Sequence, residues 1–386
     1  MIVVNGKILT MAGAVHEPGY VAIENGKIVS CGPMDQCPAD GERVDAAGGW
    51  VLPGLVDIHT HLGLFEDSLG FEGEDGNEDT DPITPQLRAL DGINPLERSF
   101  AESRAAGVTT VLVSPGSANP IGGQIVAIKT AGRRVDDMVI RQPAAMKMAL
   151  GENPKHVYNG KNQAPVTRMA TAALIRQCLR EAQEYDRALQ RAREEKEIDP
   201  PDFDPKLDAM LPVVRGEIPV HIHAHRADDL FTAIRIAKEF HLSYVLIHGT
   251  QAHLVADLLG QEGAQVVSGP YLTDRSKPEL QGMTPAAPAL LWRAGLPCAI
   301  TTDHPETPLK YLMDCAAAAV KHGMDEGDAL AAITIQSARI GGVSDRVGSL
   351  EPGKDADLVV YSGNPFHYQT TVRMVFIDGH PVKEEV

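Results

Sequence analysis

Residues 51–62 read Val-Leu-Pro-Gly-Leu-Val-Asp-Ile-His-Thr-His-Leu, an apolar run that ends in two histidines. His59 and His61 are two positions apart, and on a β-strand this spacing puts both side chains on one face. Imidazole is a good ligand for zinc and for neighbouring divalent metals. The pair therefore predicts half of a metal site at the end of a buried strand, although chance histidines at a polar strand end would give the same pattern.

The bulk properties limit the classes of protein. The chain has 386 residues, 43% of them hydrophobic, and a formal net charge of −17. This length allows one large α/β barrel or two or three ordinary domains. An acidic chain lacks the basic surface that nucleic-acid binding requires, and it tends to repel anionic lipids. The expected partner is a small-molecule substrate, with neither nucleic acid nor membrane, and a homo-oligomer is compatible with the sequence.

The cysteines and the first residues bear on location. The five cysteines are odd in number and have no CxxC spacing, which is typical of reduced thiols in the cytoplasm. The chain starts directly with a strand-like alternation, so we expect no signal peptide. It also lacks a run of about 18 apolar residues that could cross a membrane. Together these features predict a cytoplasmic protein.

The pattern of strand-like and helix-like segments changes twice along the chain. Short strand-like segments broken by turn signals fill the first 50 residues, and residues 348–361 and 375–379 show the same pattern. We therefore expect residues 1–50 and 346–386 to meet in one small sheet domain. Residues 51–345 alternate apolar runs with helical stretches, of which 168–197 is the clearest, and this alternation is typical of an α/β protein with a parallel sheet.

Eight apolar segments of the middle region are candidate strands, the number that a closed barrel requires. They are Leu55–Ile58, Thr109–Val113, a weaker one near Met138–Arg141, Ala145–Leu150, Val220–Ile222, Tyr244–Ile247, Gln265–Val267 and Cys298–Thr301.

Three further candidate strands end in residues that bind metals. His223 ends one strand, between the deeper His221 and His225, which enters the loop and could meet substrate. His248 ends the next, and Asp303 ends the last. A single histidine at a strand end is more often structural, but four strands that all end in ligand-type residues predict a metal site.

At this point the chain resembles the amidohydrolase superfamily of metal-dependent hydrolases. Its segments PGLVDIHTH, IHAHR, LIHG and TTDHP are similar to the superfamily's metal-binding strand ends, and GSLEPGKDADLVVY is similar to a return strand of its small sheet domain. Within the superfamily the chain is most similar to the imidazolonepropionase-related branch. The resemblance implies a distorted (β/α)8 TIM barrel with a small β-sandwich built from both termini.

The resemblance also implies roles for individual residues. His59, His61, His223 and His248 become metal ligands, and Asp303 becomes both a ligand and the general base. Superfamily members with two metals bridge them by a carboxylated lysine or a glutamate. Residues 145–154 offer both Lys147, inside the strand, and Glu152, just past its end. The sequence slightly favours Glu152; if neither binds metal, the site holds one ion.

The expected cofactor is one or two divalent ions, with zinc first and Mn, Fe or Co as alternatives. A metal lowers the pKa of water from 15.7 to about 7, so hydroxide is available at neutral pH. Asp303 would accept the proton as hydroxide attacks a trigonal carbon, and His248 or His225 would stabilise the oxyanion. The leading hypothesis is a hydrolase of C–N bonds in cyclic amides, N-acyl compounds or dipeptides. The alternatives are an aminoheterocycle deaminase and, last, a non-catalytic scaffold.

Pocket residues are expected in the loops that follow the strands. The glycine-rich stretch 114–124 is interpreted as a tight turn without a phosphate-loop lysine, and the acidic loop 66–81 as a lid over the active-site face. The candidate substrate-binding residues are Asn119, Gln124, Lys155, Arg168, Tyr271 and Arg275.

Overall fold

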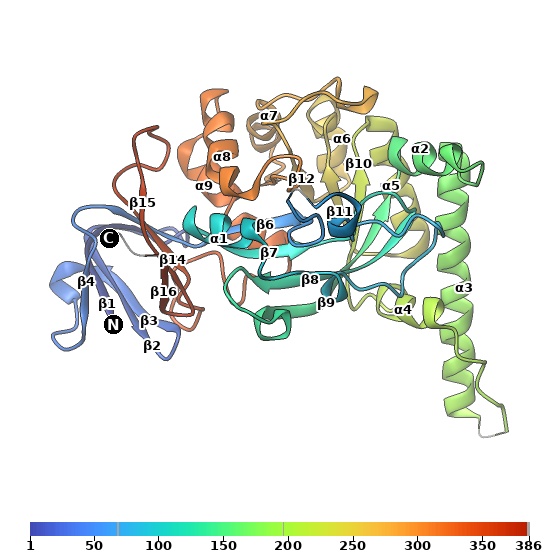
Figure 1. Ribbon diagram of the computed structural model, residues 1–386, viewed down its shortest axis with the longest axis horizontal. Coiled ribbons are helices and arrows are strands. Elements are labelled where there is room, and N and C mark those ends of the chain that lie inside the picture. The colour runs from blue at the N-terminus through green and yellow to red at the C-terminus, as the bar shows by residue number, and fades with distance from the viewer. Residues whose placement is uncertain (68, 196, 384–386) are drawn as a thin grey trace.

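The computed structural model describes residues 1–67, 69–195 and 197–383. It contains two sheets that lie side by side, with the helices gathered mainly around the second (Figure 1). The first sheet is built from both ends of the chain, and the second forms a nearly closed barrel from the middle of the chain. The α/β barrel with a terminal sheet is therefore confirmed.

The terminal sheet joins segments that are more than 300 residues apart in the sequence. The central β1 pairs with β4 through its first half and with β5 through its second half, and β5 in turn pairs with β14. Its strands are β1 (Ile2–Leu9), β2 (Val15–Glu24), β3 (Lys27–Pro33), β4 (Arg43–Asp45), β5 (Trp50–Pro53), β14 (Leu358–Tyr361), β15 (Val372–Ile377) and β16 (His380–Lys383).

The barrel strands follow one another in sequence order. They are β6 (Leu55–Thr60), β7 (Val108–Val113), β8 (Ile121–Lys129), β9 (Val139–Ala149), β10 (Val220–Ala224), β11 (Tyr244–His248), β12 (Val266–Ser268) and β13 (Ala299–Ile300). All neighbouring pairs are parallel except those of β8, which runs antiparallel to both β7 and β9. The carboxyl ends of the seven parallel strands therefore lie at one rim.

Two details of the predicted strand set are wrong. The segments Met138–Arg141 and Ala145–Leu150 belong largely to the single strand β9. Residues 121–124, interpreted as part of a tight turn, begin the strand β8, which was not among the candidates. The reason is Gly122-Gly123, which resembles a turn signal. Gly123 has φ 132°, and a Cβ there would lie 2.6 Å from the carbonyl oxygen of Leu87. The glycine thus permits a close backbone approach within a strand rather than a turn.

Asp57 closes the barrel between its first and last strands. The carboxylate is fully buried and accepts hydrogen bonds from the Thr301 hydroxyl (2.6 Å) and from the N–H (2.8 Å) and hydroxyl (2.7 Å) of Thr302. It also accepts the N–H of His59 at 3.1 Å. Burial raises the pKa of Asp57 to about 6, although these hydrogen bonds lower it in part. These hydrogen bonds fix the backbone at the ends of β6 and β13, next to His59 and Asp303.

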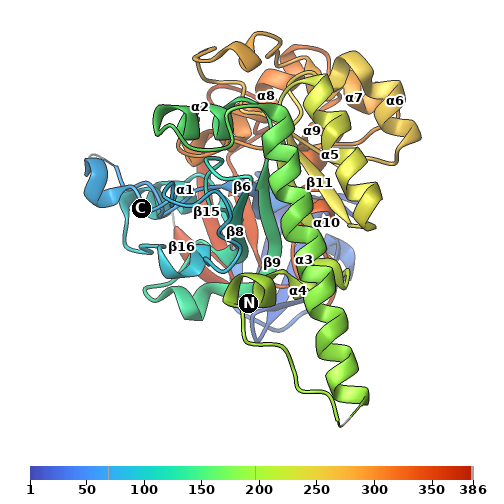
Figure 2. The same cartoon turned by 90° about the vertical axis from the view of Figure 1, so that its right-hand side faces the viewer.

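The helices cover the outside of the barrel and connect its strands (Figures 1 and 2). They are α1 (Arg98–Ala105), α2 (Glu152–Gly160), α3 (Arg168–Glu194), α4 (Pro205–Val214), α5 (Ala227–Phe240), α6 (Ala256–Gln261), α7 (Ala287–Arg293), α8 (Leu312–Lys321), α9 (Glu326–Ala332) and α10 (Ile335–Ile340).

The long predicted helix is confirmed as α3. Thr167 caps it by accepting the Ala170 N–H, as helix N-caps do. The residues from Ala172 to Tyr185 that face the barrel are apolar and buried, whereas the charged residues face outward. The predicted end at residue 197 extends past residue 196, which lies outside the described residues. The C-terminal half of α3 projects beyond the barrel (Figure 1).

A buried charge cluster holds the barrel against the terminal sheet. Lys129, at the end of β8, is 4% exposed, and its ammonium lies 2.9 Å from Asp355 Oδ2 and 3.3 Å from Asp378 Oδ1. It also donates a short hydrogen bond to Asp357. Arg346 pairs with the same Asp355 carboxylate at 2.8 Å. Because the removal of one partner from such a cluster leaves an unpaired buried charge, the cluster fixes how the two sheets meet.

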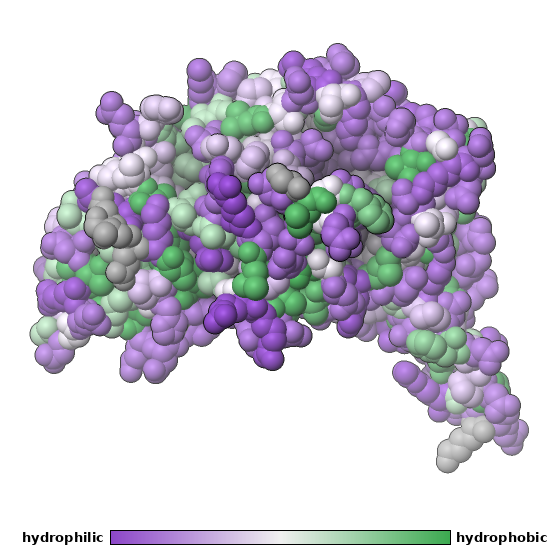
Figure 3. Space-filling view, in the orientation of Figure 1, coloured by the Kyte–Doolittle hydropathy of each residue, from purple (hydrophilic) through white to green (hydrophobic). Residues whose placement is uncertain are grey.

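The exterior is mainly hydrophilic on the face shown in Figure 3, where apolar residues form small separate patches. None of the helices in the described ranges has both the length and the apolar character that a membrane crossing requires.

Candidate metal centre

Six side chains from four strand ends meet at the carboxyl rim of the barrel. They form two neighbouring groups whose ligand atoms lie within 4.8 Å of one another, namely His59, His61 and Asp303 in the first group and His223, His225 and His248 in the second. The rings of His59 and His248 have centroids 5.0 Å apart, so the two groups adjoin. The convergence that the sequence predicted is therefore present.

The first group is organised around Asp303. Its Oδ1 atom lies 3.3 Å from His59 Nε2 and 3.4 Å from His61 Nε2, and its Oδ2 atom lies 3.9 Å from His248 Nδ1. The backbone φ angles of Asp303 (53°) and His248 (73°) are in the left-handed region, which residues other than glycine rarely adopt. Such strain costs about 1–3 kcal/mol and is concentrated at functional sites, where the surrounding structure enforces it.

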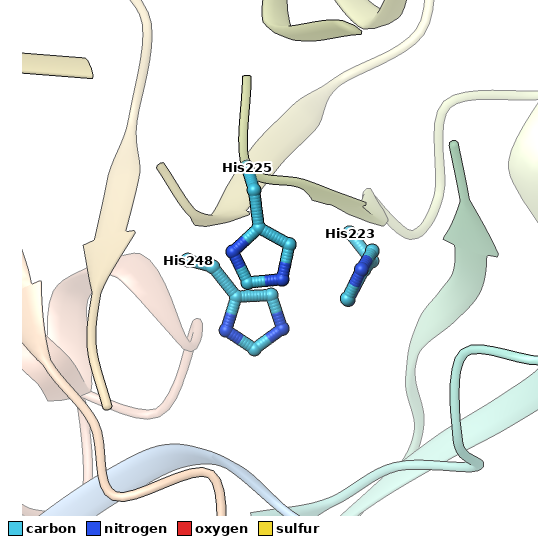
Figure 4. A group of neighbouring side chains, drawn as sticks. All are labelled: His223, His225 and His248. Carbon is cyan, nitrogen blue, oxygen red and sulfur yellow. The ribbon is translucent and has the colours of Figure 1, made fainter. Parts of the chain in front are cut away.

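The second group is shown in Figure 4. His225 and His248 are nearly parallel, with an interplanar angle of 7° and a centroid distance of 4.5 Å. His223 stands almost at right angles to both, with centroids 4.6 Å from His225 and 4.5 Å from His248. All three residues are buried.

Hydrogen bonds at the rear of the rings fit metal binding. His61 Nδ1 lies 2.7 Å from the Ser114 carbonyl and His248 Nδ1 lies 2.9 Å from the Gly269 carbonyl. Because a carbonyl can only accept, Nδ1 of each ring carries the proton and Nε2 keeps a free lone pair. This arrangement is typical of histidines that bind metal through Nε2. The residues present therefore fit divalent cations.

Burial sets the protonation of the site. It lowers the pKa of His59 and His223 well below the usual range, so both rings are neutral at pH 7, as ligands must be. Burial alone would raise the pKa of Asp303, but the interactions with His248, His59 and His61 outweigh it, and its pKa lies well below its usual range. The centre thus places an ionised, largely buried carboxylate next to the neutral ring of His59.

Lys147 and Glu152 occupy different places. Lys147 lies on β9 beside His221 of β10, is fully buried, and has its Nζ atom 3.5 Å from His59 Nε2. Burial lowers the pKa of Lys147 to about 7. Glu152 begins α2, and its Oε2 atom accepts the N–H of Glu279 at 3.3 Å. The structure thus brings Lys147, and not Glu152, to the imidazoles of the first group.

A cavity of about 430 Å³ opens over the centre. The lining combines ligand-type residues with polar and apolar ones. The lining residues are His61, Phe65, Asn77, Gly116, Ser117, Asn153, His223, His225, Pro270, Thr273, Ser276, Lys277, Leu280, Asp303, Pro305 and Glu306.

The six residues expected to bind substrate do not line this cavity in the described structure. The Asn119 amide donates to the Glu78 carbonyl and accepts the Tyr158 hydroxyl. Gln124 lies within β8, and Lys155 lies in α2. Their predicted role in substrate binding stays untested, and their positions give it no support.

The remaining three are held by other parts of the fold. The Arg168 guanidinium pairs with Asp229 at 2.9 Å, and Arg275 donates to the Met283 carbonyl at 3.0 Å. Tyr271 is buried in an apolar cluster.

Sequence reasoning took Tyr271 and Arg275 from the loop that follows β12 but missed two other residues of the same loop. Its Lys277 lines the cavity, and Glu279, in the short 3-10 helix η6 (Pro278–Leu280), has a side chain only 1% exposed beside the second group. The available signal was the position of this loop, because loops at the carboxyl ends of barrel strands face the active-site rim.

The acidic loop 66–81 packs beside the cavity. Asn77 Oδ1 accepts the Ala118 N–H at 3.1 Å, and the Gly76 carbonyl accepts the Gly116 N–H at 2.7 Å. Residue 68 of this loop lies outside the described residues. The predicted function as a lid stays a prediction.

The buried histidines predict acid sensitivity of the metal-free protein. Burial lowers the pKa to about 3 for His221 and to about 4 for His248 and His304. The unfolded chain takes up protons on these rings below about pH 6.5, so the free energy of unfolding falls as the pH drops toward 4. Asp57 offsets about one histidine's share of this loss. Its pKa is raised in the folded state, so its protonation at low pH stabilises the folded protein.

Urea unfolding of the metal-free protein at several pH values measures this effect. Three histidines at about 1.4 kcal/mol per pH unit, less one such share for Asp57, contribute a loss of about 2.8 kcal/mol between pH 6 and pH 5. His221→Asn should reduce this slope by about one histidine's share. A free energy of unfolding that is constant over this range would contradict the neutral buried rings.

The α/β barrel, the histidines at its strand ends and Asp303 define the class of this protein. It is an α/β-barrel protein with a His/Asp site suited to divalent cations. Residues 50–382 match the Amidohydrolase family, so the chain belongs to this family of metal-dependent hydrolases. The resemblance inferred from the sequence is thereby confirmed.

The relatives agree with this assignment. The chain is 31% identical over 393 residues to the amidohydrolase tasK of Hapsidospora irregularis, covering 94% of this chain but only 39% of that protein. It is 27% identical to the imidazolonepropionase of Mesorhizobium japonicum, with 92% of this chain and 90% of that protein covered. The crystal structure of an amidohydrolase from Thermotoga maritima MSB8 is 42% identical, covers 100% of both chains and has a TM-score of 0.96.

Proposed function

We propose that this enzyme hydrolyses a C–N bond in a small cyclic amide, N-acyl compound or dipeptide, with Asp303 as the general base. The observation that carries the proposal is the position of Asp303, whose carboxylate contacts the imidazoles of both strand-end groups and lines the cavity. A cyclic amide also suits the relatives named imidazolonepropionase, because an imidazolone is a cyclic amide.

The side chains support sites for two divalent cations. His59, His61 and Asp303 would hold the first, and His223 and His248 would hold the second. The bound cations would supply Lewis-acid activation of water and of the substrate carbonyl. Zinc fits a nitrogen-rich set, and Mn, Fe or Co remain compatible with it.

Lys147 is the side chain best placed to bridge the two groups. An amine with a pKa of about 7 is neutral in a large fraction of molecules at pH 7, and a neutral amine can attack carbon dioxide. The Nζ–C bond forms as one C=O π bond of carbon dioxide opens, the amine proton passes to solvent water, and a carbamate with one negative charge results. This charge would lie beside His59 and would help to hold the cations.

Asp303 can both take up and return a proton. Its low pKa keeps it ionised before the reaction, and its place in the cavity lining puts it within reach of the attacking water and the leaving nitrogen. Phe65, whose ring meets His61 edge to face at 5.7 Å, and Leu280 supply apolar contact for the body of a small substrate.

A screen with metal-reconstituted enzyme tests this proposal. Lactams, N-acyl amino acids, dipeptides and aminoheterocycles are incubated with Zn-, Mn- or Co-loaded protein, with Asp303→Asn as the blank. Ring opening or acyl release in the wild type alone supports the proposal. Ammonia release without ring opening would instead assign a deaminase, and a chain that binds no stoichiometric metal would point to a scaffold.

A further inference from the structure

Glu279 is buried beside the second group of histidines, and neither Glu279 nor His225, a member of that group, has a task in the proposed reaction. Glu279 comes from the loop after β12, and His225 follows β10 directly. Their side chains are 1% and 2% exposed. An acid and an imidazole that are removed from water to this extent need partners to offset their desolvation.

The distances between them are too long for hydrogen bonds. Glu279 Oε1 lies 3.6 Å from His223 Nε2 and 3.6 Å from His225 Nε2. Both nitrogens are buried, and neither has a hydrogen-bond partner among the described residues. An unpaired buried polar atom costs about 1–3 kcal/mol, so two of them that face one oxygen indicate a missing common partner.

The same distances suit ligands of one cation. Two ligands of a tetrahedral zinc ion lie about 3.4 Å apart, because zinc–nitrogen and zinc–oxygen bonds are about 2.1 Å long. The rear nitrogens of the rings are already engaged, His223 Nδ1 with the Ser117 hydroxyl at 2.9 Å and His225 Nδ1 with the Thr250 hydroxyl at 2.7 Å. The Nε2 atoms of both rings are therefore free to bind a cation on the side of Glu279, as in metal-binding histidines.

The loop that carries Glu279 is fixed in place. Glu279 Oε2 accepts the Glu152 N–H at 3.0 Å, and the Glu279 N–H donates to the Glu152 carboxylate at 3.3 Å. Gly151 makes room for this contact, because a Cβ there would lie 2.9 Å from Glu279 Oε2. The second carboxylate oxygen, Oε1, is thereby directed at the two imidazoles.

We propose that Glu279 and His225 are ligands of the second cation, in addition to His223 and His248. This inference rests on the proposed function for the presence of a second cation, and it adds a carboxylate from the loop after β12 to its coordination. Lys277, whose ammonium lies 2.9 Å from Glu279 Oε1, balances the carboxylate charge in the metal-free protein. Lys277 and the cation thus compete for the same oxygen.

Because of this competition, replacing Glu279 and replacing Lys277 should have opposite effects on the affinity for the second cation. Glu279→Gln removes a charged ligand and should weaken binding of the second cation at least tenfold, as should His225→Asn on a different element. Lys277→Met removes the competing ammonium and should leave that affinity unchanged or raise it. If Glu279 and Lys277 only fixed the loop through their ion pair, both substitutions would weaken the cation to a similar extent.

The measurement is a calorimetric titration of chelator-treated protein with Co²⁺ alone, followed in parallel by the visible absorption of the bound ion. Glu306→Gln, which removes another carboxylate of the cavity lining, is the matched control and should keep the wild-type stoichiometry and affinities. Thermal unfolding of each metal-free variant verifies that it is folded.

The possible outcomes separate the two proposals. Two sites in the wild type, one of them weakened in Glu279→Gln and His225→Asn but not in Lys277→Met, support the inference. Two sites with unchanged affinities in Glu279→Gln and His225→Asn overturn the inference alone. A wild type that binds at most one Co²⁺ overturns the two-cation form of the proposed function, and the inference with it.

Discussion

Asp303→Asn is expected to lower turnover by about a thousandfold, which lies within the range of 10²–10⁴ for the loss of a general base. The amide has almost the same size as the carboxylate but cannot accept the proton of the attacking water. One amide oxygen remains next to His59 and His61, which lie 3.3 and 3.4 Å from the carboxylate. Metal content, measured by elemental analysis after saturation with zinc, should therefore stay near the wild-type value.

Glu306→Gln is the matched control for this substitution. Its carboxylate lines the same cavity three residues further on, but it forms no ion pair with the site histidines in the described structure. We expect its turnover to change by no more than about tenfold, since a remote charge acts only through the field of the cavity. An Asp303→Asn enzyme with wild-type turnover would eliminate Asp303 as the base.

Lys147→Met is expected to remove one of the two cations and to lower turnover at least about a hundredfold, comparable with the loss of a ligand's support in other metal sites. The methionine fills the same buried volume but cannot form a carbamate. Glu152→Gln should retain both cations, because Glu152 contacts the loop of Glu279 rather than the imidazoles. Elemental analysis of both variants, reconstituted side by side, measures the difference.

Carbon dioxide provides an independent readout for Lys147. Wild-type protein that is stripped of metal and reconstituted in buffer free of carbon dioxide and bicarbonate should regain its second cation only when bicarbonate is added. Loss of a cation in Glu152→Gln, with full occupancy in Lys147→Met, would contradict this prediction. It would support Glu152, which the sequence slightly favoured, as the bridging residue.

Much of the fold could be predicted because local signals and tertiary structure agree. The apolar run before His59 and the runs before His223 and His248 are short buried strands, and their ends carry the candidate metal ligands. The alternating ends of the chain correctly indicated a sheet formed by both termini. In each case the hydrophobic pattern and the position of the polar residue specify the same arrangement.

The structure departs from, or gives no support to, the sequence-based expectations where the local signal and the tertiary contact differ. The glycines of β8 indicated a turn, but they permit the close approach of another backbone. Arg168 and Asn119 are polar residues near the predicted rim, and no sequence pattern shows that Asp229 and Tyr158 already engage them. Glu279 is separated by 54 residues from His225, so its contact with the imidazoles depends on barrel closure, which sequence spacing does not encode.

The ammonium of Lys129 has a consequence for how the polypeptide matures. Its carboxylate partners, Asp355, Asp357 and Asp378, lie near the C-terminus, more than 220 residues further along the chain. A nascent polypeptide whose first four barrel strands have already emerged from the ribosome must keep this lysine hydrated until the last segment is synthesised. The cluster that fastens the terminal sheet to the barrel can therefore form only when translation is almost finished.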